Sequence, residues 1–193
     1  PNSGITEMKQ LQGKHVTLVP NFILEYIMDE FAKKDDFTYE ITEIDSFSAR
    51  SEALLNDQVD GAVYTEPQAS MLEASGAHVL GSSKEAGING GTIQFMTDVL
   101  KDRPQDVAAF YKGYNQAIDY MNEHKASEYA EILSKYQFPD AMSQYLDSQT
   151  EKYPHATEVS KDIFESIISW AKDKGQIDQE YTYDDLTDFQ FIK

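Results

Sequence analysis

Short apolar segments alternate with helical patterns over residues 14–83, and this alternation restricts the fold of the chain more than any other feature. Residues 15–19 form a short apolar stretch that Pro20 ends, and residues 38–44 and 61–65 are further apolar or β-branched stretches. Strands and helices in strict alternation are typical of a mostly parallel sheet covered by helices. We therefore predict an α/β lobe.

Three helices are predicted in the first half of the chain. The first has apolar residues at helical spacing: Leu24, Ile27, Met28 and Phe31. Ser46 is predicted to cap the second, which extends to Asn56 and turns Ala49, Ala53 and Leu54 inward. The third has Pro67 in its first turn and ends at Gly76, and residues 78–80 are predicted to begin a fourth strand.

Helical patterns dominate after the pair Gly90-Gly91, and residues 93–96 are the last segment predicted to be extended. Pro104 is predicted to open a helix with apolar residues at Val107, Phe110, Tyr111, Tyr114, Ile118 and Met121. A second helix has Tyr129, Ala130, Leu133 and Tyr136 and ends near Pro139, and a third begins after Ser160, buries Ile163, Phe164, Ile167 and Ile168, and stops at Gly175. The expected domains are an α/β lobe at 14–90 and a helix-rich segment at 91–193.

The charge balance excludes several kinds of partner. With 34 acidic and 16 basic residues, the chain has a formal net charge of −18 and would repel nucleic acid and anionic membrane surfaces. There is no cysteine, so disulfides, thiolate nucleophiles and cysteine metal sites are excluded. The sequence contains no apolar run of membrane-spanning length and no signal peptide.

The motifs of common enzymes are also missing. The four histidines, His15, His78, His124 and His155, are far apart and lack the spacing of a zinc site. There is no glycine-rich phosphate loop and no G-x-S-x-G nucleophile motif. The sequence therefore predicts a protein that is not an enzyme and that needs no metal or cofactor.

Candidate ligand-binding residues follow from the predicted sheet, because ligands of open α/β sheets bind at the carboxyl ends of the strands. Hydroxyls, amides and helix N-termini there suit an anion or a polar heterocycle, on which an aromatic ring can stack. The candidates are Asn21, Phe22, Tyr26, Ser46, Ser48, Tyr64, Thr65, Glu66 and Gln94.

Each candidate also has a purely structural interpretation. Ser46 can simply cap its helix, Phe22 and Tyr64 can belong to the core, and Glu66 can favour a helix N-terminus electrostatically. Arg50 is the nearest candidate partner for an anion. An equally acceptable interpretation is that Arg50 is a solvated residue on the helix surface.

Three sequence segments resemble a known family in their order along the chain. These are "LQGKHVTLVP", "DSFSARSEALLNDQVDGAVYTEPQASMLEASGAHVL" and "MTDVLKDRPQDVAAFYKGYNQAIDYMNEH". The layout resembles the nitrate/sulfonate/taurine and thiamine-precursor (hydroxymethylpyrimidine) substrate-binding proteins of ABC importers. The matching positions are Gly13-Lys14, Ala53-Leu54, Val59-Asp60, Glu66-Pro67 and Pro104 with Val107 and Phe110.

The resemblance implies a type II periplasmic-binding-protein-like fold, with a three-layer αβα lobe followed by a helix-rich C-terminal part. It implies a small-molecule ligand (a sulfonate, taurine, nitrate or a pyrimidine precursor), closure of two lobes on it, and docking on an ABC permease. The expected location is extracellular or periplasmic, with a membrane anchor through a removed lipoprotein signal.

One departure from the family is that the usual N-terminal βα stretch of the first lobe does not precede Leu11-Gln12-Gly13-Lys14. Residues 14–90 then correspond to the second lobe, and the later helices return to an incomplete first lobe. Apolar faces left exposed on those helices favour a dimer.

Two other functions stay open alongside the transport component. One is a ligand-sensing effector domain of the same fold in a regulator. The other is an enzyme similar to the pyrimidine-synthesising relatives, whose cysteine-containing site this chain lacks.

Overall fold

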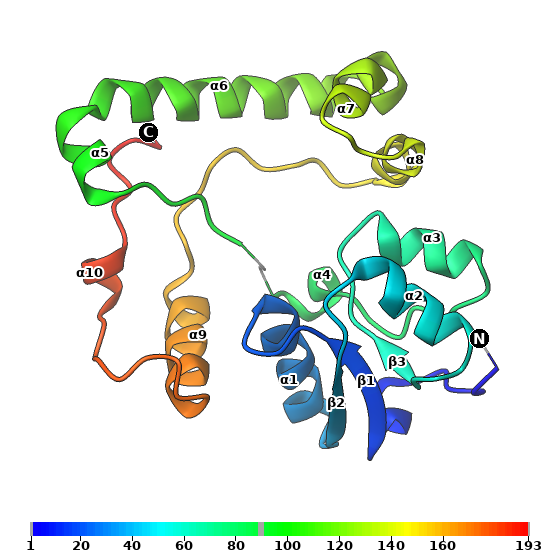
Figure 1. The fold of residues 1–193 in the computed structure, drawn as a ribbon. Helices are drawn as coiled ribbons and strands as arrows, with labels where there is room; N and C mark the ends of the chain where they lie inside the picture. Colours follow the sequence, from blue (N-terminus) through cyan, green and yellow to red (C-terminus); the bar gives the residue numbers. More distant parts are fainter. Residues whose placement is uncertain (1, 89–90, 193) are drawn as a thin grey trace. The chain divides into compact units, whose positions relative to one another are not determined.

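The computed structural model describes residues 2–88 and 91–192 of the chain. The chain divides into two compact units (Figure 1). The first comprises Pro1–Gly91 together with Trp170–Gln176, and the second comprises Thr92–Ser169 together with Ile177–Lys193. Each unit is described separately.

The first unit is built on a small parallel sheet. Its strands are β1 (Lys14–Leu18), β2 (Tyr39–Glu43) and β3 (Gly61–Ala62), in the order β2-β1-β3. Both pairs are parallel, with Val16 of the central strand opposite Ile41 on one side and Gly61 on the other. The predicted α/β class with a parallel sheet is thus confirmed.

Helices cover both faces of the sheet, and two of them connect its strands (Figure 1). They are η1 (Met8–Leu11), α1 (Ile23–Asp35), α2 (Phe47–Leu55), α3 (Gln68–Ala74) and α4 (Ser83–Ala86). The connection from β1 to β2 and the connection from β2 to β3 run in opposite directions across the sheet. Because such crossovers are right-handed, α1 and α2 lie on opposite sides of the strands (Figure 1).

The core of this unit lies between the central strand and α1. It consists of Ile5, Leu11, Val16, Leu18, Met28, Ala32 and Phe37, with Met8, Tyr39, Val63 and Leu80 packed against it. Gly61 lets β3 approach closely, because a Cβ there would lie 3.3 Å from Leu11 Cδ2 and 3.4 Å from Val16 Cγ2. A glycine at position 61 is therefore explained by the close packing of β3 against Leu11 and Val16.

Three sequence predictions for the first unit are wrong. Residues 78–80 form no strand: Leu80 packs on the core, but Val79 is 53% exposed and the segment has no ladder partner among the described residues. The third strand stops at Ala62, short of the predicted Thr65. On α2, Ala53 is buried as predicted but Ala49 is exposed, and Arg50 takes the inner position.

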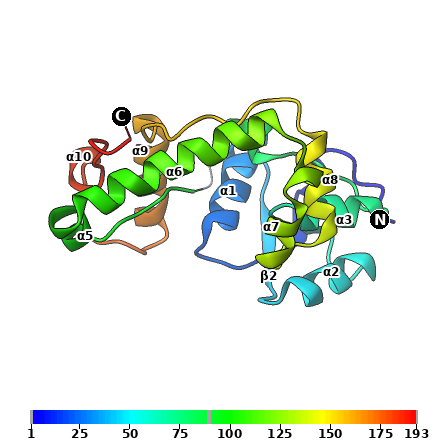
Figure 2. The ribbon, with the colours of Figure 1, turned by 90° about the horizontal axis from the view of Figure 1, so that it is seen from above.

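All regular secondary structure described in the second unit is helical. Its elements are α5 (Thr97–Asp102), α6 (Pro104–Glu123), η2 (Ala126–Glu128), α7 (Ala130–Lys135), α8 (Asp140–Ser148), α9 (Lys161–Asp173) and α10 (Tyr183–Leu186). The last turn of α9 belongs to the first unit. Figure 2 shows α6 as one continuous helix, and Pro104 occupies its first turn as predicted.

Few side chains of the second unit are buried. The buried hydrophobic side chains are those of Val107, Ile118, Ala126 and Tyr129. Several large apolar side chains are exposed instead: Met96, Phe110, Ile132, Tyr136, Phe138 and Leu186. The expectation that α9 buries Ile163, Phe164, Ile167 and Ile168 is wrong, because these side chains are only half-buried. Residues 93–96 form neither helix nor strand, and the sequence did not predict α5 and α8.

Candidate functional site

The three strands end at one edge of the sheet because all of them run in the same direction. Three connections therefore begin at this edge. Asn21 and Phe22 lie in the connection from β1 to α1, Ser46 lies between β2 and α2, and residues 64–66 lie between β3 and α3. The structure thus brings eight of the nine predicted residues into one unit, following three neighbouring strand ends.

The connection after β1 is held by contacts within the unit. Asn21 is exposed, has a φ of 60°, and donates its backbone N–H to the Glu25 carboxylate at 2.5 Å. Its side-chain Oδ1 accepts from Gln176 Nε2 at 3.4 Å. Phe22, the N-cap of α1, is 62% exposed. Tyr26 is buried, and its ring contacts the Trp170 ring edge-on, with the two ring centroids 5.7 Å apart.

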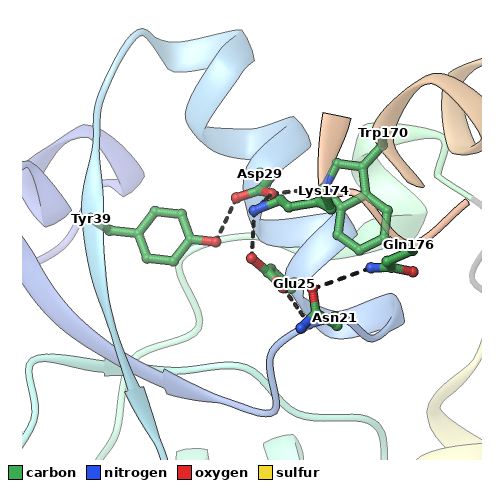
Figure 3. A network of polar contacts seen from close by, with 7 residues as sticks. All are labelled: Asn21, Glu25, Asp29, Tyr39, Trp170, Lys174 and Gln176. Atoms are coloured by element: carbon green, nitrogen blue, oxygen red, sulfur yellow. Dashed lines mark hydrogen bonds and ion pairs between the residues drawn. The ribbon is translucent and has the colours of Figure 1, made fainter. Parts of the chain in front are cut away.

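A network of polar contacts joins α1 to the last turn of α9 (Figure 3). The Glu25 side chain is only 4% exposed, and its Oε1 accepts from Lys174 Nζ at 2.5 Å. Lys174 also forms an ion pair of 2.9 Å with Asp29. The Asp29 carboxylate accepts from Tyr39 Oη at 2.6 Å and from Trp170 Nε1 at 2.8 Å. The network therefore ties a helix that follows β1 to a segment far along the chain.

The network shifts the pKa of two of its members upward. Burial, followed by the hydrogen bond to Asp29, raises the pKa of Tyr39 far above its ordinary value. Burial lowers the pKa of Lys174, but its hydrogen bonds to Glu25 and Asp29 raise it by more, so the net shift is upward. Near neutral pH, Tyr39 is therefore neutral and Lys174 charged in the folded chain.

We expect the stability of the chain to fall as the pH rises above about 10. Tyrosine and lysine ordinarily titrate at 10.0 and 10.5, so above these values the unfolded chain releases protons that folded Tyr39 and Lys174 retain. Their contribution is fully present below pH 10 and is lost as the pH rises through the folded values. Urea unfolding at about pH 8 and about pH 11 measures the loss, and Tyr39→Phe should reduce it. An unchanged pH dependence in that variant would contradict the assignment to Tyr39.

The second connection contributes a helix cap, and the third contributes a partly covered tyrosine, Tyr64, that lies beside α2. Ser46 Oγ accepts from the Ala49 backbone N–H at 3.4 Å, which confirms the predicted cap. Ser48 is exposed in the first turn of α2. Tyr64 Oη lies 3.1 Å from Ser51 Oγ. Burial raises the pKa of Tyr64, although Ser51 and Arg50 oppose the shift, so its hydroxyl is neutral at ordinary pH.

Arg50 is the residue of this edge whose surroundings the sequence did not reveal. It is 1% exposed, so the interpretation as a solvated helix residue is wrong. Its Nη1 donates to the Val63 carbonyl at 3.3 Å, and its guanidinium carbon lies 4.5 Å from the Phe47 ring centroid and 5.3 Å from that of Tyr64. The spacing of Arg50 and Ala53, three residues apart on one helix face, is the signal that pointed inward.

The remaining candidates differ in their surroundings. Thr65 is exposed, and the Glu66 carboxylate accepts from Ser70 at 3.1 Å from the backbone N–H and 2.8 Å from the hydroxyl. Gln94 lies in the second unit, where its Nε2 donates to Thr92 Oγ1 at 3.2 Å. Glu66 thus accepts hydrogen bonds from the first turn of α3, whereas Gln94 belongs to the other unit and is not among the residues grouped at this edge.

The described part of the chain has neither a metal-binding cluster nor a membrane-spanning helix. No three His, Cys, Asp or Glu side chains of residues 2–88 and 91–192 are grouped so that they can hold a metal ion. Within the same ranges, every helix is too short or too polar to cross a bilayer.

Two solved structures are similar to this chain. The periplasmic sulfonate-binding protein SsuA from Methylobacillus flagellatus KT matches 99% of the chain with a TM-score of 0.76 and 16% identity. The periplasmic aliphatic sulphonate binding protein SsuA from Escherichia coli matches 90% of it with a TM-score of 0.71 and 14% identity. The chain spans 62% and 58% of the lengths of these proteins. This likeness confirms the predicted type II periplasmic-binding-protein-like fold.

Comparison with curated proteins gives no significant match. A family model, described as NMT1/THI5 like, matches residues 1–127, which is more than half of the chain. The match bears out the resemblance to ABC-importer binding proteins found in the sequence. The chain therefore belongs to the NMT1/THI5-like family.

Proposed function

We propose that this chain is part of the solute-binding component of an ABC importer and binds a small polar or anionic organic solute. The observation that carries the proposal is the edge of the parallel sheet, where three successive connections present hydroxyl, amide and aromatic side chains. Edges of this kind are the usual ligand sites of open α/β sheets. The two similar structures are described as sulfonate-binding, which favours sulfonates among the candidate solutes.

Within this site, Tyr64 is the best placed of the predicted residues. It is half-buried, its hydroxyl is held by Ser51, and its ring lies beside the exposed ring of Phe47, with centroids 6.0 Å apart. A ring fixed in this way loses little freedom when a solute packs on it. Phe22, exposed at the start of α1, is a second candidate for contact with an apolar part of the solute.

The proposal includes binding without chemical turnover, docking on a permease and a location outside the cytoplasm. The last of these agrees with the periplasmic location that both similar structures carry in their descriptions. Closure on the ligand, expected from the family resemblance, remains part of it. A ligand-sensing domain of a regulator is the alternative, and fusion to a DNA-binding or signalling domain would distinguish it.

We expect a binding solute to raise the melting temperature of the chain. A ligand at 100 times its Kd stabilises the folded state by about 2.7 kcal/mol, which corresponds to roughly 5–10 °C for a chain of this size. The measurement is a thermal-shift screen with taurine, alkanesulfonates, nitrate, bicarbonate and pyrimidine precursors, followed by calorimetric titration of each hit. Absence of a shift with all of them would reject the proposal, as would detectable turnover of any one of them.

Variants of the sheet edge locate the site. Tyr64→Ala with Glu66→Ala should weaken binding of the solute found in the screen by at least about tenfold, because a packed ring and a polar contact are removed. Tyr136→Ala is the matched control, since Tyr136 lies in the second unit and is 68% exposed. Unchanged affinity in the double variant would remove Tyr64 and Glu66 from the site.

A further inference from the structure

Arg50 is a buried cation without an anionic partner. Among the described residues, no carboxylate forms an ion pair with it, and its contacts are the Val63 carbonyl and the rings of Phe47 and Tyr64. Its Nε is buried and has no hydrogen-bond acceptor, a condition that it shares with Thr17 Oγ1. A buried donor that is left unpaired destabilises the fold by about 1–3 kcal/mol and calls for an explanation.

One edge of the Arg50 guanidinium makes no hydrogen bond within the described residues. Nη1 is engaged by the Val63 carbonyl, which leaves the edge formed by Nε and Nη2 without a hydrogen bond in the described part of the chain. Two parallel N–H groups on a guanidinium edge match the two oxygens of a carboxylate, sulfonate or phosphate group. The geometry of an oxyanion fork is thus present.

The lack of a carboxylate partner for Arg50 is unexpected in a chain with so many acidic residues. The sequence has 34 acidic residues against 16 basic ones, and the partly exposed Lys174 has two carboxylates within 2.9 Å. The more deeply buried Arg50 has none, although Glu66 lies only three residues beyond the carbonyl that it contacts. A cation that served only to stabilise the fold would gain from such a partner.

We propose that the Nε–Nη2 edge of Arg50 binds the oxyanion group of the solute. This inference rests on the proposed solute-binding function and narrows it to organic anions whose charged group has at least two oxygens. Arg50 is 1% exposed, so a solute reaches this edge only if a neighbouring side chain moves. Phe47, 45% exposed and the nearer of the two rings to the guanidinium, is the side chain that we expect to change rotamer. The apolar part of the solute then lies against the rings of Phe47 and Tyr64.

A packing role for Arg50 is the competing explanation, because the guanidinium already stacks on two rings and bonds one carbonyl. The two explanations differ in what an added anion does. A packing residue keeps the same surroundings when an anion is added, whereas an oxyanion fork gains two hydrogen bonds at Nε and Nη2.

The sequence allows a direct measurement, since Arg50 and Arg103 are its only arginines. Arg103 is exposed and paired with Asp106 at 2.6 Å, so it serves as an internal control. The Nε–H signals of both are recorded by ¹H–¹⁵N NMR on the full chain, assigned with Arg103→Lys, and titrated with 1-hexanesulfonate or with neutral 1-hexanol. We expect the Arg50 signal to shift with hexanesulfonate but not with hexanol, while the Arg103 signal shifts with neither.

Variants give the affinity for the same probe by calorimetry. Arg50→Met should weaken hexanesulfonate binding by about 10- to 100-fold, since two hydrogen bonds to a charged group are lost. Arg50→Lys keeps the charge and the aliphatic stem, so it tests the fork if the Met variant fails to fold, and it should still bind at least several-fold more weakly than wild type. Arg103→Met should bind as wild type does.

The possible outcomes separate the two proposals. Hexanesulfonate binding with an unmoved Arg50 signal, or with unchanged affinity in Arg50→Lys, overturns the role of Arg50 and leaves solute binding intact. Binding of hexanol but not hexanesulfonate, or binding of only the pyrimidine precursors in the thermal-shift screen, likewise overturns the role of Arg50 and leaves solute binding intact. Failure of every solute in that screen rejects the solute-binding function itself and this inference with it.

Discussion

Replacing Lys174 with Met is expected to lower the free energy of unfolding by about 2–4 kcal/mol. Removing one partner of a buried ion pair leaves the other charge uncompensated, at about 3–5 kcal/mol when both are fully buried. Here the Glu25 side chain is 4% exposed and that of Lys174 is 32% exposed, so the effect is somewhat smaller. Chemical denaturation near neutral pH, followed by tryptophan fluorescence, measures it, since the single tryptophan, Trp170, is part of the same network.

Lys161→Met is the matched control for this prediction. Lys161 is the first residue of α9, the helix that Lys174 directly follows. Its ion pair with Glu165 is exposed on both sides and spans 3.8 Å, so we expect a change below about 0.5 kcal/mol. The double variant Glu25→Gln with Lys174→Met should recover part of the lost stability, because the buried carboxylate is removed together with its cation. Equal losses in Lys174→Met and Lys161→Met would show that the network contributes nothing beyond a surface pair.

Replacing Leu18 with Ala is expected to destabilise the chain by about 2–5 kcal/mol. Leu18 ends the central strand, is fully buried and belongs to the core between β1 and α1, so its truncation leaves a cavity. Leu55→Ala provides a control within the same unit, because Leu55 is 37% exposed at the end of α2. The two variants are compared by urea unfolding, and a loss below 1 kcal/mol in Leu18→Ala would contradict the assignment of the core.

The first unit was predictable from the sequence to the extent that its elements are periodic. β1 and β2 have stretches of apolar or β-branched residues, and Ser46 caps α2 as its residue type suggests. Residues 78–80 misled the prediction because a short apolar stretch can pack on a core without joining a ladder, as Leu80 does. Strand pairing depends on a neighbour that local sequence does not reveal.

The helices that were missed are short. α5 has six residues and only Val99 and Leu100 as large apolar side chains, and α8 follows Pro139, which the sequence suggested only as the end of a helix. Apolar period alone also overestimated burial on α9, whose apolar residues are half-buried. Periodicity shows which side chains share a face and leaves open what covers that face.

The candidate site was predictable in its location and only partly in its chemistry. Parallel strands place Asn21, Ser46 and Tyr64 after neighbouring strand ends, which follows from topology alone. The burial of Arg50 did not follow, because arginine on a helix is usually exposed. The engagement of Glu66 by Ser70 agrees with the structural interpretation of Glu66 as a residue that favours a helix N-terminus.

The division of α9 between the two units has a practical consequence for protein engineering. Lys161–Ser169 count with one unit and Trp170–Asp173 with the other, so neither unit is one uninterrupted piece of polypeptide. A truncation at Gly91 would delete the ammonium group that neutralises Glu25 and the indole that bonds Asp29. Any shortened version of the α/β half therefore has to carry the turn from Trp170 to Gln176 along with it, by fusion or by circular permutation.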